Sequence, residues 1–254
     1  NDNGYIVLAD LNIESNLSQI FYQPDGGFSS FGDIVVSDCQ INAITTYLAT
    51  FAKANSSLNS LVVEDSDLLL NVTATATQNP AYMLNFGGKT ASITNVKFHN
   101  NVFQDVATSS TLTRFRFVMG ETAATVNDVT ITNNTLVGML LNQHGYVRVQ
   151  ALNGATVVEN NFFIESHPKN TELGILYPVK CGESMTYSVK NNVFYVKGAT
   201  KKLVLGSMVT SAGTFYEVRS FTTYPLSAGW NPAEGQFGYG EGLRYGKLSS
   251  DGTV

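Results

Sequence analysis

An eight-residue pattern of apolar and polar positions recurs seven times along the chain. It runs apolar, any, apolar, any, Asp or Asn, any, any, apolar, and residues 129–136 (VTITNNTL) show it most clearly. A strand pattern that returns at such a spacing is typical of a solenoid built from stacked repeats. The other copies start 27 to 35 residues apart, at residues 6–13, 34–41, 61–68, 96–103, 156–163 and 187–194.

The alternation in the first half of the pattern predicts a strand with one buried face. It slips at the Asp or Asn, so the chain must turn there while its apolar side chains stay inside. Asp and Asn suit such a corner because they tolerate left-handed backbone angles and bond to nearby main chain. Their side chains can also bond from repeat to repeat, as in Asn ladders. We therefore expect a structural ladder of Asp10, Asp38, Asp65, Asn100, Asn133, Asn160 and Asn191.

A second strand is predicted in most repeats, roughly 12 to 20 residues beyond the corner. The candidates are residues 82–86, 113–118, 146–151, 175–179 and 202–205. Helical periodicity is nearly absent, and only residues 45–54 could form a short helical insertion. A β-sandwich also contains many short strands, but it has no reason to repeat one pattern with the same corner. The sequence thus predicts an all-β fold, a coil of parallel strands.

The length and composition fit one domain. A chain of 254 residues can bury a large core, and the charged fraction of 14% is well below the usual quarter. The pattern fades after about residue 205, and the tail is rich in Gly, Tyr and Ser. We expect residues 1–223 to form the coil and residues 224–254 to form a cap or exit segment of the same domain, because open solenoid ends must be covered.

Several classes of function are disfavoured by composition. The net charge of −5 argues against nucleic acid as a partner. No stretch approaches the roughly 18 apolar residues of a membrane span. The chain begins at Asn1 without Met, so a processed or trimmed start is expected, and we expect a monomer. The two cysteines, Cys39 and Cys181, indicate neither a disulfide framework nor a metal site, and Cys39 is expected to be a small buried thiol at a corner.

Paired asparagines mark the corners at residues 100–101, 133–134, 160–161 and 191–192. In these corners the chain resembles the right-handed parallel β-helix proteins of the pectate-lyase-like group. It is most similar to secreted or surface β-helix proteins from the polysaccharide-utilisation systems of gut bacteria. The resemblance implies a right-handed, single-stranded parallel β-helix of about seven turns with a C-terminal cap. It also implies an extracellular, cell-surface or periplasmic location and a polysaccharide partner.

The second strands carry the candidate binding residues. Arg114 and Arg116 alternate with two phenylalanines, and Tyr146 and Arg148 alternate with two valines on what should be the adjacent strand. Arginine offers forked donors to carboxylates, and a tyrosine ring offers a flat apolar face to a sugar. The alternative is that these arginines lay their stems on the sheet and point into solvent. The predicted carbohydrate contacts are Arg114, Arg116, Tyr146, Arg148 and Tyr177.

Catalysis would require more than this row of side chains. A uronate-directed lyase needs a base, for which Arg116, Arg148 and Lys180 are the candidates, and it would bring in Ca²⁺ to neutralise the uronate. No tight Asp cluster and no histidine spacing for a metal is present. Glu64 and His99 should be neighbours on successive strands, as should Glu159 and Lys190, but such pairs on a regular sheet are more often charge neighbours than sites.

The sequence therefore predicts a non-catalytic protein that binds a polysaccharide, with anionic glycans the ones that the arginines suit, and with no metal or other cofactor. Two alternatives stay open. One is a pectate-lyase-like enzyme that cleaves uronates by β-elimination. The other is an adhesion or structural spacer without a glycan site.

Overall fold

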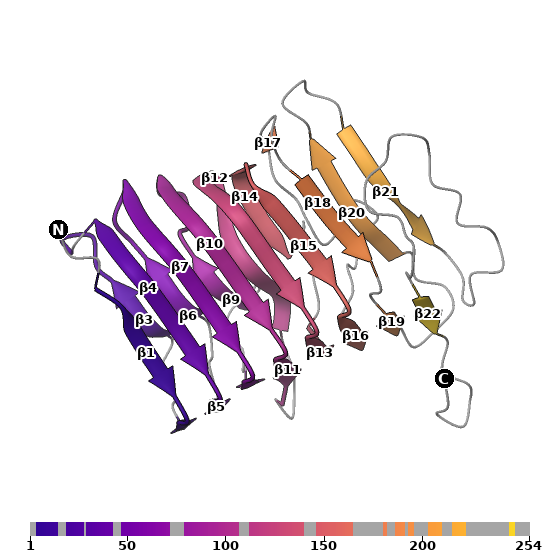
Figure 1. Ribbon diagram of the computed structural model, residues 1–254, viewed down its shortest axis with the longest axis horizontal. Coiled ribbons are helices and arrows are strands. Elements are labelled where there is room, and N and C mark those ends of the chain that lie inside the picture. The colour runs from indigo at the N-terminus through magenta and orange to yellow at the C-terminus, as the bar shows by residue number, and fades with distance from the viewer. Residues whose placement is uncertain are drawn as a thin grey trace.

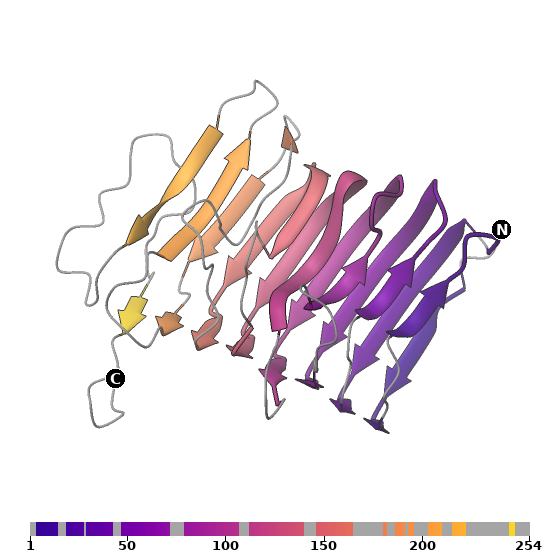
Figure 2. The ribbon, with the colours of Figure 1, turned by 180° about the vertical axis from the view of Figure 1, so that it is seen from behind.

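The computed structural model describes residues 4–14, 19–27, 29–42, 47–71, 79–106, 112–139, 146–164, 180–181, 186–190, 193–195, 203–209, 215–221 and 244–246. Side chains are described up to residue 164, except for those of residues 79–80, 112–114 and 121–122. The described residues are all-β, without a helix, and the two large sheets are parallel throughout. Figures 1 and 2 show the strands side by side along the long axis, with the N-terminus at one end.

The first half of each pattern forms one strand of the larger, 12-stranded sheet. The register pairs equal positions of successive repeats, for example Ile6 with Ile34 and Val96 with Val129. The pattern therefore predicted both the strands and their alignment. These strands are β1 (Ile6–Ala9), β4 (Ser30–Ser37), β7 (Ser56–Glu64), β10 (Ala91–His99), the end of β12 (Leu112–Thr132), β15 (Ala155–Glu159) and β18 (Thr186–Lys190).

A second series of parallel strands belongs to the same sheet. It consists of β3 (Gln19–Gln23), β6 (Tyr47–Phe51), β9 (Asn79–Asn85), the start of β12, β14 (Val147–Leu152) and β17 (Lys180–Cys181). Because β12 runs through both series, the sheet curls back on itself. The possible helical insertion at residues 45–54 is not found in the described residues 47–54, because β6 lies there and buries Leu48, Ala49 and Phe51. The expected strand at residues 175–179 lies outside the described residues.

A glycine permits the passage of β12 from one series to the other. Gly120 is buried, and a Cβ atom built on it would collide with the Cβ of Ala124. The register of β12 with β14 also shifts between Gly120 and Thr125. Only a residue without a side chain fits where the strand doubles over itself so closely.

The second half of each pattern forms a separate parallel sheet of eight strands. These strands are β2 (Asn12–Glu14), β5 (Gln40–Asn42), β8 (Asp67–Leu70), β11 (Val102–Asp105), β13 (Thr135–Val137), β16 (Phe162–Ile164), β19 (Val193–Tyr195) and β22 (Arg244–Gly246). The last strand comes from the segment that the sequence assigned to the cap, and it pairs with β19.

The segments after β19 depart from the repeat. β20 (Leu203–Val209) and β21 (Phe215–Phe221) pair with each other in an antiparallel two-stranded sheet. The strand expected at residues 202–205 is present, because residues 203–205 lie in β20, but its expected place in the parallel second series is wrong.

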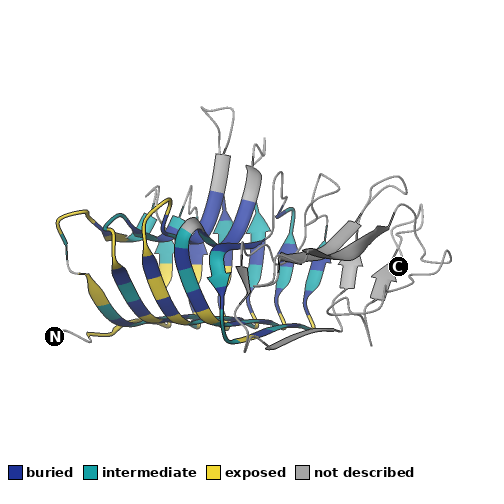
Figure 3. Ribbon diagram, turned by 90° about the horizontal axis from the view of Figure 1, so that it is seen from above, coloured by how far each residue is buried: buried dark blue, intermediate teal, exposed yellow. Residues whose placement is uncertain are grey.

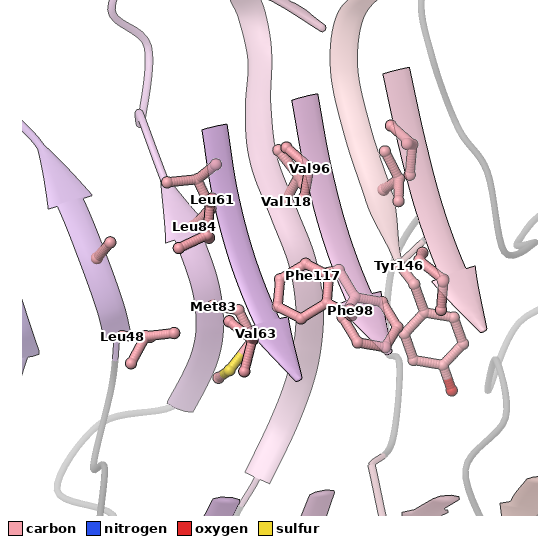
Figure 4. Packing of buried hydrophobic residues seen from close by; sticks show 14 of the residues in the cluster. Leu48, Leu61, Val63, Met83, Leu84, Val96, Phe98, Phe117, Val118 and Tyr146 are labelled. Carbon is pink, nitrogen blue, oxygen red and sulfur yellow. The ribbon is translucent and has the colours of Figure 1, made fainter. Parts of the chain in front are cut away.

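The core lies between the sheets. Along β7 the buried Leu61 and Val63 flank the half-buried Val62, which is the predicted alternation. Figure 3 shows this change between buried and more exposed positions along the strands. Phe98 of β10 packs on Phe117 of β12 with ring centroids 4.7 Å apart and the rings tilted by 44°, and Figure 4 shows the two rings next to each other. Burial of such aromatic rings dominates the stability of a core of this kind.

Candidate functional site

The predicted corners adopt left-handed backbone angles. Asp10, Asp38, Asp65, Asn100, Asn133 and Asn160 have φ between 50° and 59°, and Asn191 lies outside the described residues. They also line up from repeat to repeat, because the N–H of each of the first five donates to the carbonyl that precedes the next corner, as Asn100 N does to Thr132 O over 3.0 Å. The prediction of a turn at these six residues is therefore confirmed.

The interior ladder is made by the residue after each corner, which corrects the prediction. The six described corner side chains are exposed, and among them only Asn100 reaches a neighbouring corner residue, donating to Asp65 Oδ1 over 2.6 Å. In contrast, Asn101, Asn134 and Asn161 are buried. Asn101 Nδ2 donates to Asn134 Oδ1, and Asn134 Nδ2 donates to Asn161 Oδ1, each over 3.0 Å. A left-handed corner turns the next side chain inward, so the second Asn of each pair fills the core.

The ladder continues into the N-terminal repeats with smaller side chains. Ser66 N donates to Asn101 Oδ1 over 3.0 Å, and Cys39 N donates to Ser66 Oγ over 3.0 Å. Cys39 is 3% exposed, and its thiol donates to the carbonyl of Ser37 over 3.1 Å. The expectation of a small buried thiol at this corner is confirmed.

Arg116 is buried rather than presented to solvent. Its side chain is 0% exposed, Nη1 donates to the Tyr82 hydroxyl over 3.1 Å, and the guanidinium lies 5.2 Å from the centre of the Tyr82 ring. Arg148 is also buried, at 9% exposure. Both residues lie on adjacent strands as expected, but Arg148 aligns with Met119 instead of Arg116. Three residues of offset separate the two by about 10 Å along the strands.

Tyr146 is a core residue, so the prediction that it shares an outer face with Arg148 is wrong. It is 0% exposed, its ring packs 5.6 Å from that of Phe163, and its hydroxyl donates to the carbonyl of Met139 over 3.0 Å. Burial raises the pKa of Tyr146. Figure 4 shows Tyr146 on the same side of the sheet as Phe98. Tyr146 and Val147 are buried in succession, which shows that the alternation breaks here.

The remaining candidates are not placed with their side chains. Tyr177 lies outside the described residues, and for Arg114 and Lys180 only the backbone is described. Lys180 aligns with Ala151 of β14. Their predicted roles in binding or catalysis stay predictions.

A row of side chains crosses the second series of strands. Tyr47, Tyr82 and Arg116 align on β6, β9 and β12, and the two tyrosine rings lie 5.6 Å apart. Burial, and then the neighbouring Tyr82, raise the pKa of Tyr47. The row combines ring stacking with a cation over a ring, which stabilises the packing of these strands. It does not present its guanidinium to a ligand.

The charge neighbours predicted on the first series are confirmed in register. His99 aligns with Glu64, and Glu159 aligns with Lys190. Glu64 pairs with Lys97 at 2.6 Å instead of with His99, whose Nδ1 lies 2.8 Å from the hydroxyl of Thr132. Both partners of the ion pair are about one-third exposed, so the pair contributes little to stability.

A polar groove that the sequence analysis missed crosses β4, β7 and β10. It encloses about 430 Å³. Ser30, Ser57 and Ser92 align at one level of the three strands. Its lining consists of Ser30, Phe31, Gly32, Asp33, Ser57, Leu58, Asn59, Ser92 and Thr94. The sequence does contain a signal for this groove. In three successive repeats, polar residues occupy alternate positions just before the eight-residue pattern.

Asp33 organises the groove. Its Oδ1 accepts hydrogen bonds from Asn59 Nδ2 and Ser60 Oγ, each over 2.6 Å. The Ser57 hydroxyl donates to the Ser30 hydroxyl over 3.2 Å. The groove thus offers a fixed carboxylate and a row of hydroxyls.

No group of three or more His, Cys, Asp or Glu side chains in the described part of the chain could hold a metal ion. Nor does this part contain a helix of the length and hydropathy that crossing a membrane requires.

Comparison of the chain with protein-family models, with curated proteins and with solved structures gave no match.

Proposed function

We propose that this protein binds polysaccharide without catalysing a reaction, and that a glycan chain lies in the groove over β4, β7 and β10. The observation that carries the proposal is the aligned row of Ser30, Ser57 and Ser92 beside the carboxylate of Asp33. A repeated polar group on successive strands suits a ligand that itself repeats.

The groove has the chemistry that sugars require. A serine hydroxyl donates and accepts hydrogen bonds, as a sugar hydroxyl does, and a carboxylate accepts charge-assisted ones. Asp33 Oδ1 already takes two hydrogen bonds, and its Oδ2 takes none from the described part of the chain. Oδ2 is therefore placed to accept a bond from a ligand.

The direction of the polymer follows from the sheet. Neighbouring strands lie about 4.8 Å apart, so the row of serines runs across the strands. A glycan lying along the stack would meet a similar group at each strand. Because Asp33 is the one charged residue among the groove's lining residues, we propose a neutral glycan in place of the anionic one that the arginines suggested.

We infer that the curled parallel sheets close into a right-handed parallel β-helix of about seven turns. The support is the parallel pairing of equal positions in successive repeats, together with the strong preference of parallel crossovers for the right hand, about 98%. A secreted or surface location goes with this proposal. The lyase alternative gains no support from Arg116 and Arg148, since both are buried.

Affinity electrophoresis in gels that contain neutral or anionic polysaccharides tests the proposal. We expect neutral glycans to retard the protein, and Ser57→Val and Ser92→Val to reduce the retardation. Ser37→Val is the matched control, because Ser37 lies on β4 outside the groove lining.

Three results would count against the proposal. If no glycan retards the protein, the alternative of a structural spacer without a glycan site is favoured. Equal retardation of the groove variants and wild type would move the site elsewhere. Formation of an unsaturated product from a glycan, detected by ultraviolet absorbance, would support the lyase alternative.

A further inference from the structure

The row of serines in the groove continues onto a fourth strand. Ser30, Ser57 and Ser92 align on β4, β7 and β10, and Thr125 of β12 aligns with Ser92. The residue after each of these four belongs to the core or packs against it, so the four hydroxyls point outward. Figure 1 shows the four strands side by side. The row of hydroxyls ends on β14, where Ala151 aligns with Thr125.

A second polar row follows the first, two residues further along the strands. It consists of Asn59 of β7, Thr94 of β10 and Asn127 of β12, which are all exposed. The residues on either side of them align from strand to strand. Two residues along a strand span about 7 Å, so the two rows form the edges of a track that a single sugar ring can bridge.

Carboxylates lie beside this track. Asp33 and Asp128 stand at the two ends of the next row, with Ser60 and Asn95 between them. Oδ1 of Asp128 accepts a hydrogen bond from the backbone N–H of Ala155 over 2.7 Å. None of the residues in the three rows is basic. Two fixed negative charges repel a uronate and therefore favour a neutral chain.

We propose that the ligand is a neutral, extended, β-1,4-linked glucan or mannan that lies along the strand stack and crosses β4, β7, β10 and β12. This inference rests on the proposed function and specifies its ligand. Neighbouring strands lie about 4.8 Å apart, so the four strands extend the site over about 14 Å.

The spacing of the strands selects the linkage. An extended β-1,4-linked chain advances by about one strand spacing per sugar and carries hydroxyls along both of its edges. Successive sugars can therefore make similar contacts on successive strands. An α-1,4-linked glucose chain coils instead, so its hydroxyls leave the register of the two polar rows.

Isothermal titration calorimetry with β-1,4-linked oligomers of glucose and of mannose, from disaccharides to hexasaccharides, tests the inference. A disaccharide fits over β4, β7 and β10, whereas a hexasaccharide also reaches β12. Hexasaccharides of the preferred sugar should therefore bind at least about tenfold more tightly than disaccharides. The α-1,4-linked glucose hexasaccharide should bind at least about tenfold more weakly than the β-1,4-linked one.

Variants separate the fourth strand from the groove. Thr125→Val should weaken hexasaccharide binding about three- to tenfold, as expected for one lost hydrogen bond, and should leave disaccharide binding unchanged. Ser57→Val should weaken the binding of both. Thr130→Val is the matched control on β12, because Thr130 is half-buried like Thr125 but lies outside the track, and it should change neither.

The outcomes distinguish this inference from the proposed function. Equal affinity for the two linkages, or hexasaccharide binding that Thr125→Val leaves unchanged, would overturn the inference while the groove stays a glycan site. If these oligomers do not bind but another polysaccharide retards the protein in a gel, the proposed function stands and the inference fails. If no glycan of any class binds, both fail.

Discussion

The side chain of Asn101 donates from Nδ2 to Oδ1 of Asn134 in the next repeat over 3.0 Å, and the backbone N–H of Asn101 donates to the same oxygen over 3.0 Å. Asn134 in turn donates to the carbonyl of Phe98 over 2.9 Å. The buried side-chain amide of Asn134 therefore forms hydrogen bonds with the main chain of neighbouring repeats as well as with the next amide of the ladder. Because its partners are buried with it, removal leaves them without hydrogen bonds in the core.

Replacement of Asn134 by alanine should be strongly destabilising. Asn134→Ala removes the acceptor of Asn101 and the donor to Phe98, and the side chain is 1% exposed. Buried polar groups left without partners cost about 1–3 kcal/mol each, so we expect a loss of about 3 kcal/mol in the free energy of unfolding. Urea denaturation measures it.

Asn134→Asp gives the companion test for the ladder. It keeps the size of the side chain but removes the Nδ2 donor and adds a charge that is costly to bury. It should destabilise at neutral pH at least as much as Asn134→Ala. Wild-type stability for either variant would mean that the amide ladder does not hold the repeats together.

Asn133, the corner residue one position before Asn134, affects stability through its backbone angle. Asn133 is exposed and has a φ of 59°. Asn133→Gly should leave the free energy of unfolding nearly unchanged, because glycine enters left-handed angles readily. Asn133→Val should lower it by about 1–3 kcal/mol, because a β-branched residue is strained there. Thermal unfolding measures the difference. Equal stability of the two variants would contradict the left-handed backbone angle at residue 133.

These two asparagines show how far the sequence could predict the ladder. The Asp or Asn at each corner was recognisable because left-handed angles restrict the residue type locally. Which of Asn133 and Asn134 points inward depends on the rotation that the corner itself introduces. Strand alternation does not extend across such a turn, so the ladder was assigned one residue too early.

A similar break explains the second series of strands. Phe117 and Val118 are both buried, as are Tyr146 and Val147, so burial does not alternate along either segment at this level. The expected alternation of Tyr146 and Arg148 with two valines therefore fails, and it assigned Tyr146 to the wrong face. The offset between Arg116 and Arg148 comes from register, which unequal segment lengths hide from the sequence.

The groove escaped prediction for another reason. Ser30, Ser57 and Ser92 have small side chains without a distinctive motif, and they lie 27 and 35 residues apart. Only the register of β4, β7 and β10 brings them to one level. A signal of this kind becomes visible once the strands are aligned by their corners.

Buried Tyr146 predicts a dependence of stability on pH. Burial raises its pKa in the folded protein above the value of about 10 for the unfolded chain, so the folded state holds the proton more tightly. This contribution to stability is complete below pH 10 and is lost as the pH rises above it. Unfolding measured across alkaline pH should show the loss.

Tyr146→Phe separates this ionisation from the hydrogen bond. Loss of the bond to the Met139 carbonyl should cost about 1 kcal/mol at neutral pH. Above pH 10 the variant should lose stability less steeply than wild type, because it has no hydroxyl to ionise. Parallel curves for the two proteins across that range would show that Tyr146 does not set the alkaline limit.

Each of the seven patterns has three positions where an apolar side chain is expected, and Thr156 is the one polar residue among them. It is 0% exposed, aligns with Val129 and Tyr187, and its Oγ1 has no hydrogen-bond partner among the described side chains and backbone. Valine has nearly the same shape without the hydroxyl. Thr156→Val should therefore raise the free energy of unfolding by about 1 kcal/mol, since it removes the cost of a buried polar atom without a partner.

The control is Thr130→Val, because Thr130 is a half-buried residue on the opposite face of the neighbouring strand β12. It should change the urea midpoint little, and a decrease for Thr156→Val would show that its hydroxyl is needed in the core.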